Sequence, residues 1–155
     1  MKRFKFYLFV FAILAVGCGD KSAESLYSEV ADSNAKRLGA LYLQYQVRNA
    51  ENPMLGPSSV DEFKTFISGL EEKRLSLIGI NKSDIDGLFV SARDNSPYEI
   101  RLEVQGVIRG PAQPVVFEKT GVGGKYMVAF TGFIEKEVDQ TEYDRLWSGA
   151  ADDGT

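Results

Sequence analysis

Cys18 is the only cysteine among the 155 residues, and the sequence contains no histidine. These two facts limit the chemistry that the protein can perform. Without histidine there is no Ser-His-Asp or Cys-His catalytic unit and no imidazole ligand for a metal. A single cysteine forms no disulfide within the chain and cannot complete a zinc site made of cysteine and histidine ligands. Any role of Cys18 must therefore come from its position in the sequence.

Three other patterns contain residue types that could do chemistry, and each lacks a part that the chemistry requires. Gly121–Lys125 is rich in glycine and ends in lysine, but it lacks the first glycine and the final Ser or Thr of a phosphate-binding loop. Asp84–Gly87 has the alternating carboxylates of a calcium loop, but basic residues occupy the first and last ligand positions. Glu99 and Glu103 fit the solvated face of a strand better than a catalytic pair. We therefore predict no catalytic residue, no metal site and no cofactor.

The N-terminal segment is typical of an export signal. Residues 1–5 include three basic residues and no acidic one, and residues 6–16 form an uninterrupted apolar run. A helix of that length would span about half of a hydrocarbon core that is about 30 Å thick, so we do not expect a permanent membrane-spanning helix. The run ends at Gly17 and Cys18, where the small residues of a cleavage site are expected.

The sequence Leu14-Ala15-Val16-Gly17-Cys18 resembles the lipobox of bacterial lipoproteins. In that family signal peptidase II cuts before a cysteine that has received a diacylglyceryl group. The resemblance implies lipidation of Cys18 and cleavage between Gly17 and Cys18, although Ala15 stands where the family usually has leucine. The alternative is an ordinary cleavage site at Ala15-Val16-Gly17 with an incidental thiol at Cys18. The position of the only cysteine, where the apolar run stops, favours lipidation.

Removal of residues 1–17 changes what the chain is expected to bind. Three basic charges leave with this segment, so the net charge goes from −4 to −7. Such a chain offers no basic surface for nucleic acid or for an anionic membrane, whereas two or more acyl chains give stable anchoring. We expect an exported protein held on a membrane through Cys18, with a tether at 18–25, one domain at 26–147 and a flexible tail at 148–155. The choice between the inner and outer membrane and the oligomeric state stay open.

The first half of the domain has the pattern of helices. Between Leu26 and Val47 the apolar residues recur at helical spacing, which predicts one amphipathic helix of five to six turns. Ser59 and Glu62 have the spacing of a capping box and predict that a second helix starts there. The apolar stripe of this second helix continues to Leu70.

The second half of the domain has the pattern of strands. Apolar and polar residues alternate from Tyr98 to Gln105, which predicts a strand with one solvated face. Three further strands are expected at 115–118, 125–130 and 133–138, joined by glycine-containing turns, and Asp139 can cap a last short helix. These elements predict an α+β fold. The long N-terminal helix and the second helix pack on a roughly four-stranded antiparallel meander, and a short C-terminal helix follows.

Three stretches of the domain resemble the soluble part of pseudopilin-like proteins. They are Asn34-x-x-Arg37-Leu38-Gly39-x-Leu41-Tyr42-x-x-Tyr45, Phe89-x-Ser91-x-Arg93-Asp94-x-x-Pro97-Tyr98 and Val128-Ala129-Phe130-Thr131-Gly132-Phe133-Ile134. Pilin-like subunits build filaments through a long apolar N-terminal helix, which this chain replaces with a short signal and a lipid site. The resemblance implies a pseudopilin-like domain on a lipid anchor, in an accessory or sensing role.

These observations lead to one main hypothesis and two alternatives. The main hypothesis is a non-enzymatic, lipid-anchored envelope protein whose domain binds another envelope protein or has a structural role. One alternative is an enzyme that uses carboxylate, lysine or tyrosine chemistry. The other is an accessory component of a pilus-like secretion apparatus.

Overall fold

The computed structural model describes residues 32–149, in which helices come first, then strands, then a last helix. The helices are α2 (Asn34–Arg48), α3 (Val60–Ser68), α4 (Glu72–Leu77), α5 (Ile85–Leu88) and α6 (Gln140–Trp147), with a 3-10 helix, η1 (Lys82–Asp84). The strands, antiparallel neighbours in chain order, are β1 (Glu99–Ile100), β2 (Pro114–Phe117), β3 (Tyr126–Phe130) and β4 (Ile134–Val138). The predicted α+β fold with a four-stranded meander and a C-terminal helix is confirmed.

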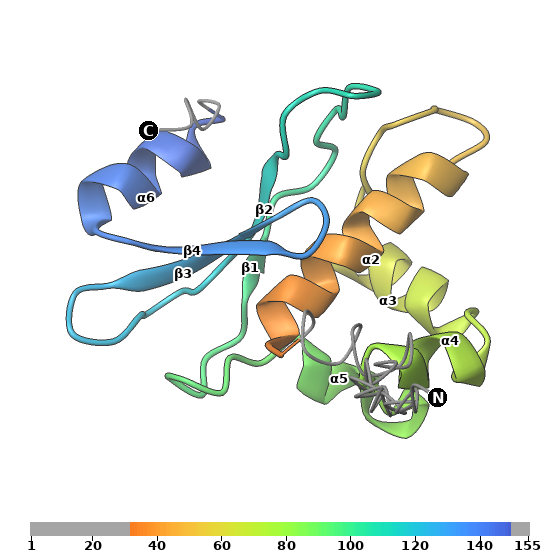
Figure 1. The fold of residues 1–155 in the computed structure, drawn as a ribbon, viewed down its shortest axis with the longest axis horizontal. Helices are drawn as coiled ribbons and strands as arrows, with labels where there is room; N and C mark the ends of the chain where they lie inside the picture. The colour runs from red at the N-terminus through yellow and green to blue at the C-terminus, as the bar shows by residue number, and fades with distance from the viewer. Residues whose placement is uncertain (1–31, 150–155) are drawn as a thin grey trace, which may run out of the picture.

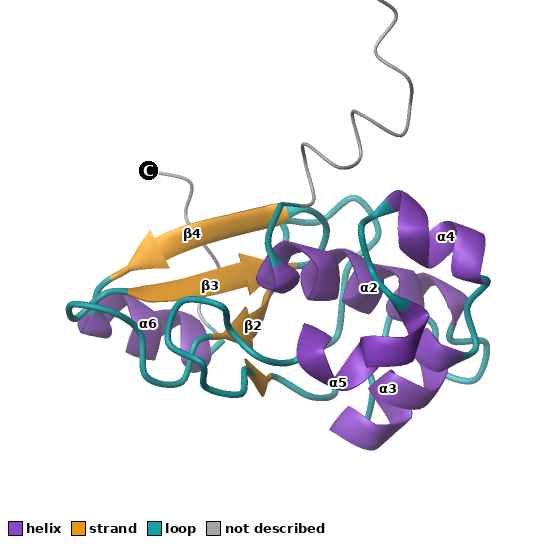
Figure 2. Ribbon diagram, turned by 90° about the horizontal axis from the view of Figure 1, so that it is seen from below, coloured by secondary structure: helices purple, strands orange, loops and turns teal. Residues whose placement is uncertain are grey.

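The helices are divided between the two ends of the molecule. Figure 1 shows α3, α4 and α5 beside α2 at one end and α6 at the other, and Figure 2 shows the same division from below. Between these groups, α2 contacts β2, β3 and β4. α2 is therefore the element that connects the helical end of the domain to the sheet.

The start of α2 differs from the sequence-based prediction. Ser33 has an extended backbone, and its hydroxyl accepts a hydrogen bond from the Lys36 amide at 3.1 Å. This N-cap begins the helix at Asn34, because the serine hydroxyl satisfies an amide of the first turn that has no carbonyl partner within the helix. The single helix predicted from Leu26 is therefore wrong at Asp32 and Ser33, and its first residues, 26–31, lie outside the described part of the chain.

α2 meets the β3–β4 hairpin at Gly39, where the two backbones approach closely. The Gly132 amide donates a hydrogen bond to the Gly39 carbonyl oxygen at 3.0 Å. A Cβ atom on Gly39 would lie 2.1 Å from the Phe130 carbonyl oxygen. Only glycine fits at this crossing without moving the helix.

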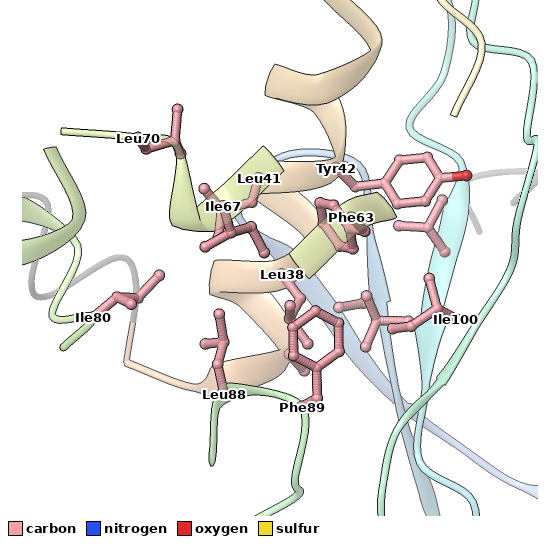
Figure 3. Close-up of a cluster of buried hydrophobic side chains, with 14 of the residues drawn as sticks. Leu38, Leu41, Tyr42, Phe63, Ile67, Leu70, Ile80, Leu88, Phe89 and Ile100 are labelled. Atoms are coloured by element: carbon pink, nitrogen blue, oxygen red, sulfur yellow. The ribbon is translucent and has the colours of Figure 1, made fainter. Parts of the chain in front are cut away.

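Two clusters of buried side chains form the core. The larger lies between α2, α3 and the sheet, and Figure 3 shows Tyr42, Phe63 and Phe89 pointing into it from three different segments. The ring of Phe63 meets the other two edge to face, with centroids 5.6 and 5.8 Å apart. The smaller cluster lies under α6, where Leu146 contributes a fully buried side chain. Leu88 and Phe89 are also buried.

The strand predicted from Tyr98 to Gln105 is much shorter in the structure, which is a correction to its length. β1 contains only Glu99 and Ile100, and beyond it Glu103 adopts a positive φ of 52°. The segment then bonds to the loop before α3, since Gly56 donates its amide to the Val104 carbonyl oxygen at 3.0 Å. The alternating pattern survives only in part, because Leu102 is 40% exposed.

The predicted helix starts at Ser59 and Asp139 are confirmed. The Ser59 hydroxyl accepts from the Glu62 amide at 3.1 Å, and the Asp139 carboxylate accepts from the Glu142 amide at 3.0 Å. The carboxylate of Glu62 differs from the capping-box expectation, because it accepts from the amide and hydroxyl of Ser58, at 2.7 and 2.6 Å. Both caps are local arrangements, so the sequence was sufficient to place them.

Candidate functional site

The predicted lipidation and cleavage site, Gly17 and Cys18, lies outside the described residues. The same is true of the predicted tether at 18–25 and of the tail beyond Gly149. Within residues 32–149, no helix is both long enough and apolar enough to cross a bilayer.

The glycine-rich stretch Gly121–Lys125 is a hairpin turn between β2 and β3. Val122 and Lys125 exchange backbone hydrogen bonds at 2.8 and 3.0 Å. Gly121, Gly123 and Gly124 all have positive φ, which side chains other than glycine rarely adopt. The turn needs these glycines for its own geometry, as predicted.

The carboxylates of the Asp84–Gly87 stretch have structural partners. Asp84 accepts a hydrogen bond from the Gly87 amide at 3.1 Å and so caps α5. Asp86 forms an ion pair with Lys64 at 2.6 Å. In the described part of the chain, no group of three or more acidic or cysteine side chains is arranged to hold a metal ion.

Glu99, Arg101 and Glu103 do not share one solvated face, which corrects the expectation for this strand. The Arg101 guanidinium turns inward and donates to the carbonyl oxygens of Pro114 and Leu146, at 3.1 and 3.4 Å. Burial lowers the pKa of Arg101 below its usual value. Glu103 lies beyond the end of β1 and is exposed. The two glutamates therefore form no catalytic pair.

A buried carboxylate that the sequence did not single out is Glu118, immediately after β2. It is fully buried and accepts hydrogen bonds from the Ser91 hydroxyl and the Met127 amide, both at 2.8 Å. Arg93 lies 3.6 Å away and also pairs with Glu137 at 2.8 Å. No local signal marks Glu118 as buried, because its partners come from residues far from it in the chain.

Glu118 lines a cavity of about 270 Å³ near the start of α2, and several other charged side chains line it as well. Glu135 also lines this cavity and accepts from the Ser33 hydroxyl at 2.6 Å, with Lys36 at 3.6 Å. Burial raises the pKa of Tyr98, in the same wall, to about 12. Both carboxylates thus have hydrogen-bond partners and a basic side chain nearby, and Tyr98 holds its proton at neutral pH. These groups join α2 to the sheet and do not form an acid–base pair.

A larger and mostly apolar pocket of about 670 Å³ lies at the C-terminal end of α2. Its walls are the last turns of α2, the 53–54 loop, the 106–113 loop and the start of β4. In Figure 1 the loops after α2 and before β2 lie at the end of α2 opposite its N-terminus. The pocket is lined by Leu43, Gln46, Val47, Pro53, Met54, Gly106, Val107, Ile108, Arg109, Gly110, Pro111, Ala112, Gln113, Thr131 and Ile134.

The pocket gathers apolar side chains that remain in contact with water. Val47, Val107, Ile108 and Ile134 are 67%, 63%, 76% and 53% exposed. They are half of the eight large hydrophobic side chains that are exposed on the described surface. A contiguous exposed apolar surface of this kind typically marks a binding site.

Backbone hydrogen bonds hold both ends of the 106–113 loop, and Arg109 at its tip has an unfavourable backbone conformation. The Gly106 amide donates to the Met54 carbonyl oxygen, and the Thr131 amide donates to that of Gln113, both at 2.8 Å. Arg109 and Met54 have φ values of 60° and 68°, and they are two of the four non-glycine residues with positive φ in the described chain. Such conformations cost about 1–3 kcal/mol and concentrate at functional sites.

Gln46 places one unpaired polar atom at this pocket. Its side-chain nitrogen donates to the Val104 carbonyl oxygen at 2.9 Å, which fixes the orientation of the amide. Its carbonyl oxygen, Oε1, is the one buried side-chain polar atom in the described residues that has no hydrogen-bond partner. An unpaired buried acceptor costs about 1–3 kcal/mol, and a ligand that donates a proton to it would recover that energy.

Comparison with protein-family models, with curated proteins and with solved structures found no match to the chain. The functional assignment therefore depends on the pocket itself, which the sequence analysis missed. The segment from Gly106 to Pro114 lies between two predicted strands, so the sequence indicated only a connecting loop there. Its signal was the adjacent pair Val107 and Ile108, two apolar residues inside a predicted loop.

Proposed function

We propose that the protein is an exported, lipid-anchored envelope protein whose domain binds another envelope component. Cys18 carries the lipid, and the apolar pocket at the C-terminal end of α2 is the binding site. The observation that carries the binding role is the pocket, with its exposed apolar walls and the unpaired Oε1 of Gln46. Pockets of about 300–1,000 Å³ with apolar walls and a few polar groups are typical ligand sites.

The position of the pocket suits a membrane-attached protein. The chain that follows Cys18 enters the described part of the domain at Asp32, next to the N-terminus of α2. The pocket lies at the other end of this helix, whose 15 residues span about 22 Å. The helix therefore separates the attachment point from the site, which leaves the pocket accessible to a partner.

The two alternatives receive less support. The carboxylates of the cavity near the start of α2, Glu118 and Glu135, already accept hydrogen bonds from neighbouring donors, which favours a structural role for them over acid–base catalysis. The accessory role in a pilus-like secretion apparatus stays a prediction, because only the sequence resemblance favours it.

The anchor is tested by the mass of the mature N-terminus in the membrane fraction. We expect a chain that starts at Cys18 with attached acyl chains, and we expect Cys18→Ala to leave the membrane. An unmodified Cys18, or unchanged membrane retention of Cys18→Ala, would refute the anchor.

The binding role is tested with a photoreactive amino acid placed at Ile108, in the pocket, or at Lys73, an exposed residue of α4. Irradiation of intact cells should give a discrete adduct from position 108 and none from position 73. The same adducts from both positions, or none from either, would contradict a binding role for the pocket.

A further inference from the structure

The pocket at the end of α2 has a chemistry that selects its ligand. Among residues 32–149, its lining contains no acidic side chain, and Arg109 is the only charged residue in it. The remaining walls are mostly apolar, and the Gln46 carbonyl oxygen is the unpaired acceptor. A ligand that satisfies all of these groups needs an apolar body, a proton donor and a negative charge.

We infer that the pocket binds the C-terminal end of a peptide whose last residues are apolar, an inference that rests on the proposed function. The backbone N–H of such a peptide donates to Gln46 Oε1, and its terminal carboxylate pairs with Arg109. Its apolar side chains cover Val47 and Ile108. A fatty acid has the apolar body and the carboxylate but, once ionised, no donor for Oε1, so it leaves the unpaired acceptor unsatisfied.

The side chain of Met54 lines the pocket together with Gln46. A Cβ atom on Gly106 would lie 3.0 Å from the Met54 methyl carbon and 3.2 Å from Gln46 Oε1, so these two atoms face the same small space. Methionine is unbranched and flexible, and it readily changes rotamer around a ligand. In the proposed complex Met54 changes rotamer, and the peptide N–H enters the space next to Gly106 that Oε1 also borders.

Arg109 is well placed to provide the charge. It is exposed at the tip of a loop whose turn is closed by the Gly110 amide, which donates to the Val107 carbonyl oxygen at 2.9 Å. Its positive φ would suit glycine better in such a turn. The presence of arginine at this unfavourable position is consistent with a role for its side chain in binding.

The test uses the full chain in phosphatidylcholine vesicles and a peptide, Gly-Ser-Gly-Val-Ile-Leu, labelled with fluorescein at its N-terminus. Fluorescence anisotropy, corrected for vesicles without protein, measures the dissociation constant. A peptide with a C-terminal amide should bind about 10-fold more weakly, because a hydrogen bond to a charged group is lost. A peptide methylated at the last backbone nitrogen should also bind several-fold more weakly, because it cannot donate to Oε1.

Two protein variants test whether Arg109 provides the positive charge that pairs with the peptide carboxylate. Arg109→Asn removes the cation and keeps a residue that tolerates positive φ, so the turn is retained. It should bind the carboxylate and amide peptides equally. Lys119→Asn, a matched change at an exposed residue outside the pocket lining, should retain the preference for the carboxylate. An equal preference for the carboxylate in wild type and Arg109→Asn would overturn the inference.

Two further results would overturn it without affecting the proposed function. Absence of saturable peptide binding, with adducts from Ile108 still formed in cells, would show that the pocket takes another partner. Decanoate that binds through Arg109 in place of the peptide would identify a lipid ligand. If the Ile108 adducts are also absent, the proposed binding function itself fails.

Discussion

The close crossing of α2 and the β3–β4 hairpin predicts that Gly39→Ala is strongly destabilising. In a solvent-exposed helix this substitution normally stabilises by up to about 1 kcal/mol, because alanine has the higher helix propensity. Here the added methyl group would lie 2.1 Å from the Phe130 carbonyl oxygen and 2.9 Å from that of Gly132. Ordinary contacts between carbon and oxygen begin at about 3.3 Å. The helix must therefore move away from the hairpin by about 1 Å.

That movement has two costs. Overfilling a tightly packed site costs about 1–3 kcal/mol, and lengthening the bond from the Gly132 amide to the Gly39 carbonyl oxygen costs about 1 kcal/mol more. After subtraction of the propensity gain, we expect a net loss of about 1–3 kcal/mol in the free energy of unfolding. This is a large share of the roughly 5–15 kcal/mol that stabilises a typical domain.

Urea unfolding of the full chain, followed by circular dichroism, measures the loss. Gly69→Ala is the matched control, since a Cβ atom there would lie 3.4 Å from its nearest neighbour, an ordinary contact, and the backbone φ is −75°. The control should change the stability by less than about 1 kcal/mol. If Gly39→Ala is as stable as the wild type, the close approach described here is refuted.

Three other predictions concern buried or capping groups. Tyr42→Phe removes a hydroxyl that donates to the Arg101 carbonyl oxygen at 2.8 Å and accepts from the Val104 amide at 3.2 Å. This change should lower the free energy of unfolding in urea by about 1–3 kcal/mol. An unchanged unfolding midpoint would contradict this expectation. Burial raises the pKa of both Tyr42 and Tyr98 to about 12, above the ordinary value of 10.0. The stability that their raised pKa contributes is therefore complete below pH 10 and lost as the pH rises from 10 through 12. A loss of the folded circular dichroism signal that begins below pH 10, or a signal that is unchanged above pH 12, would argue against it. Asp139→Ala removes the N-cap of α6 and should lower the free energy of unfolding by about 1 kcal/mol, whereas Asp139→Asn, which keeps an acceptor, should lose little.

The local features of the fold could be predicted because their causes lie within a few residues of sequence. Ser59 and Asp139 start helices through hydrogen bonds to amides three residues ahead. The glycines of the β2–β3 turn have the positive φ that their residue type allows. The order of strands in the meander follows the chain, because strands that are consecutive in sequence usually pair as neighbours in a sheet.

The segment after β1 shows why alternation alone was not sufficient. Its pattern predicted a regular strand, but the buried hydroxyl of Tyr42, some sixty residues earlier in the chain, bonds to Arg101 and Val104. These bonds and the positive φ of Glu103 take the backbone out of the sheet. Hydrogen bonds between distant residues depend on the fold and are not visible in the local pattern.

The sequence by itself determined the fold class, the helix caps, the glycine turns and the absence of histidine chemistry, because each depends on residue type or on neighbours along the chain. The tertiary structure decided which polar groups have partners. It buried Glu118 among donors from other segments and left Oε1 of Gln46 without one. It also joined the end of α2 to two loops that are distant in sequence, and so formed the pocket. Burial and hydrogen-bond satisfaction are properties of the folded chain as a whole, so only the structure could identify the proposed binding site.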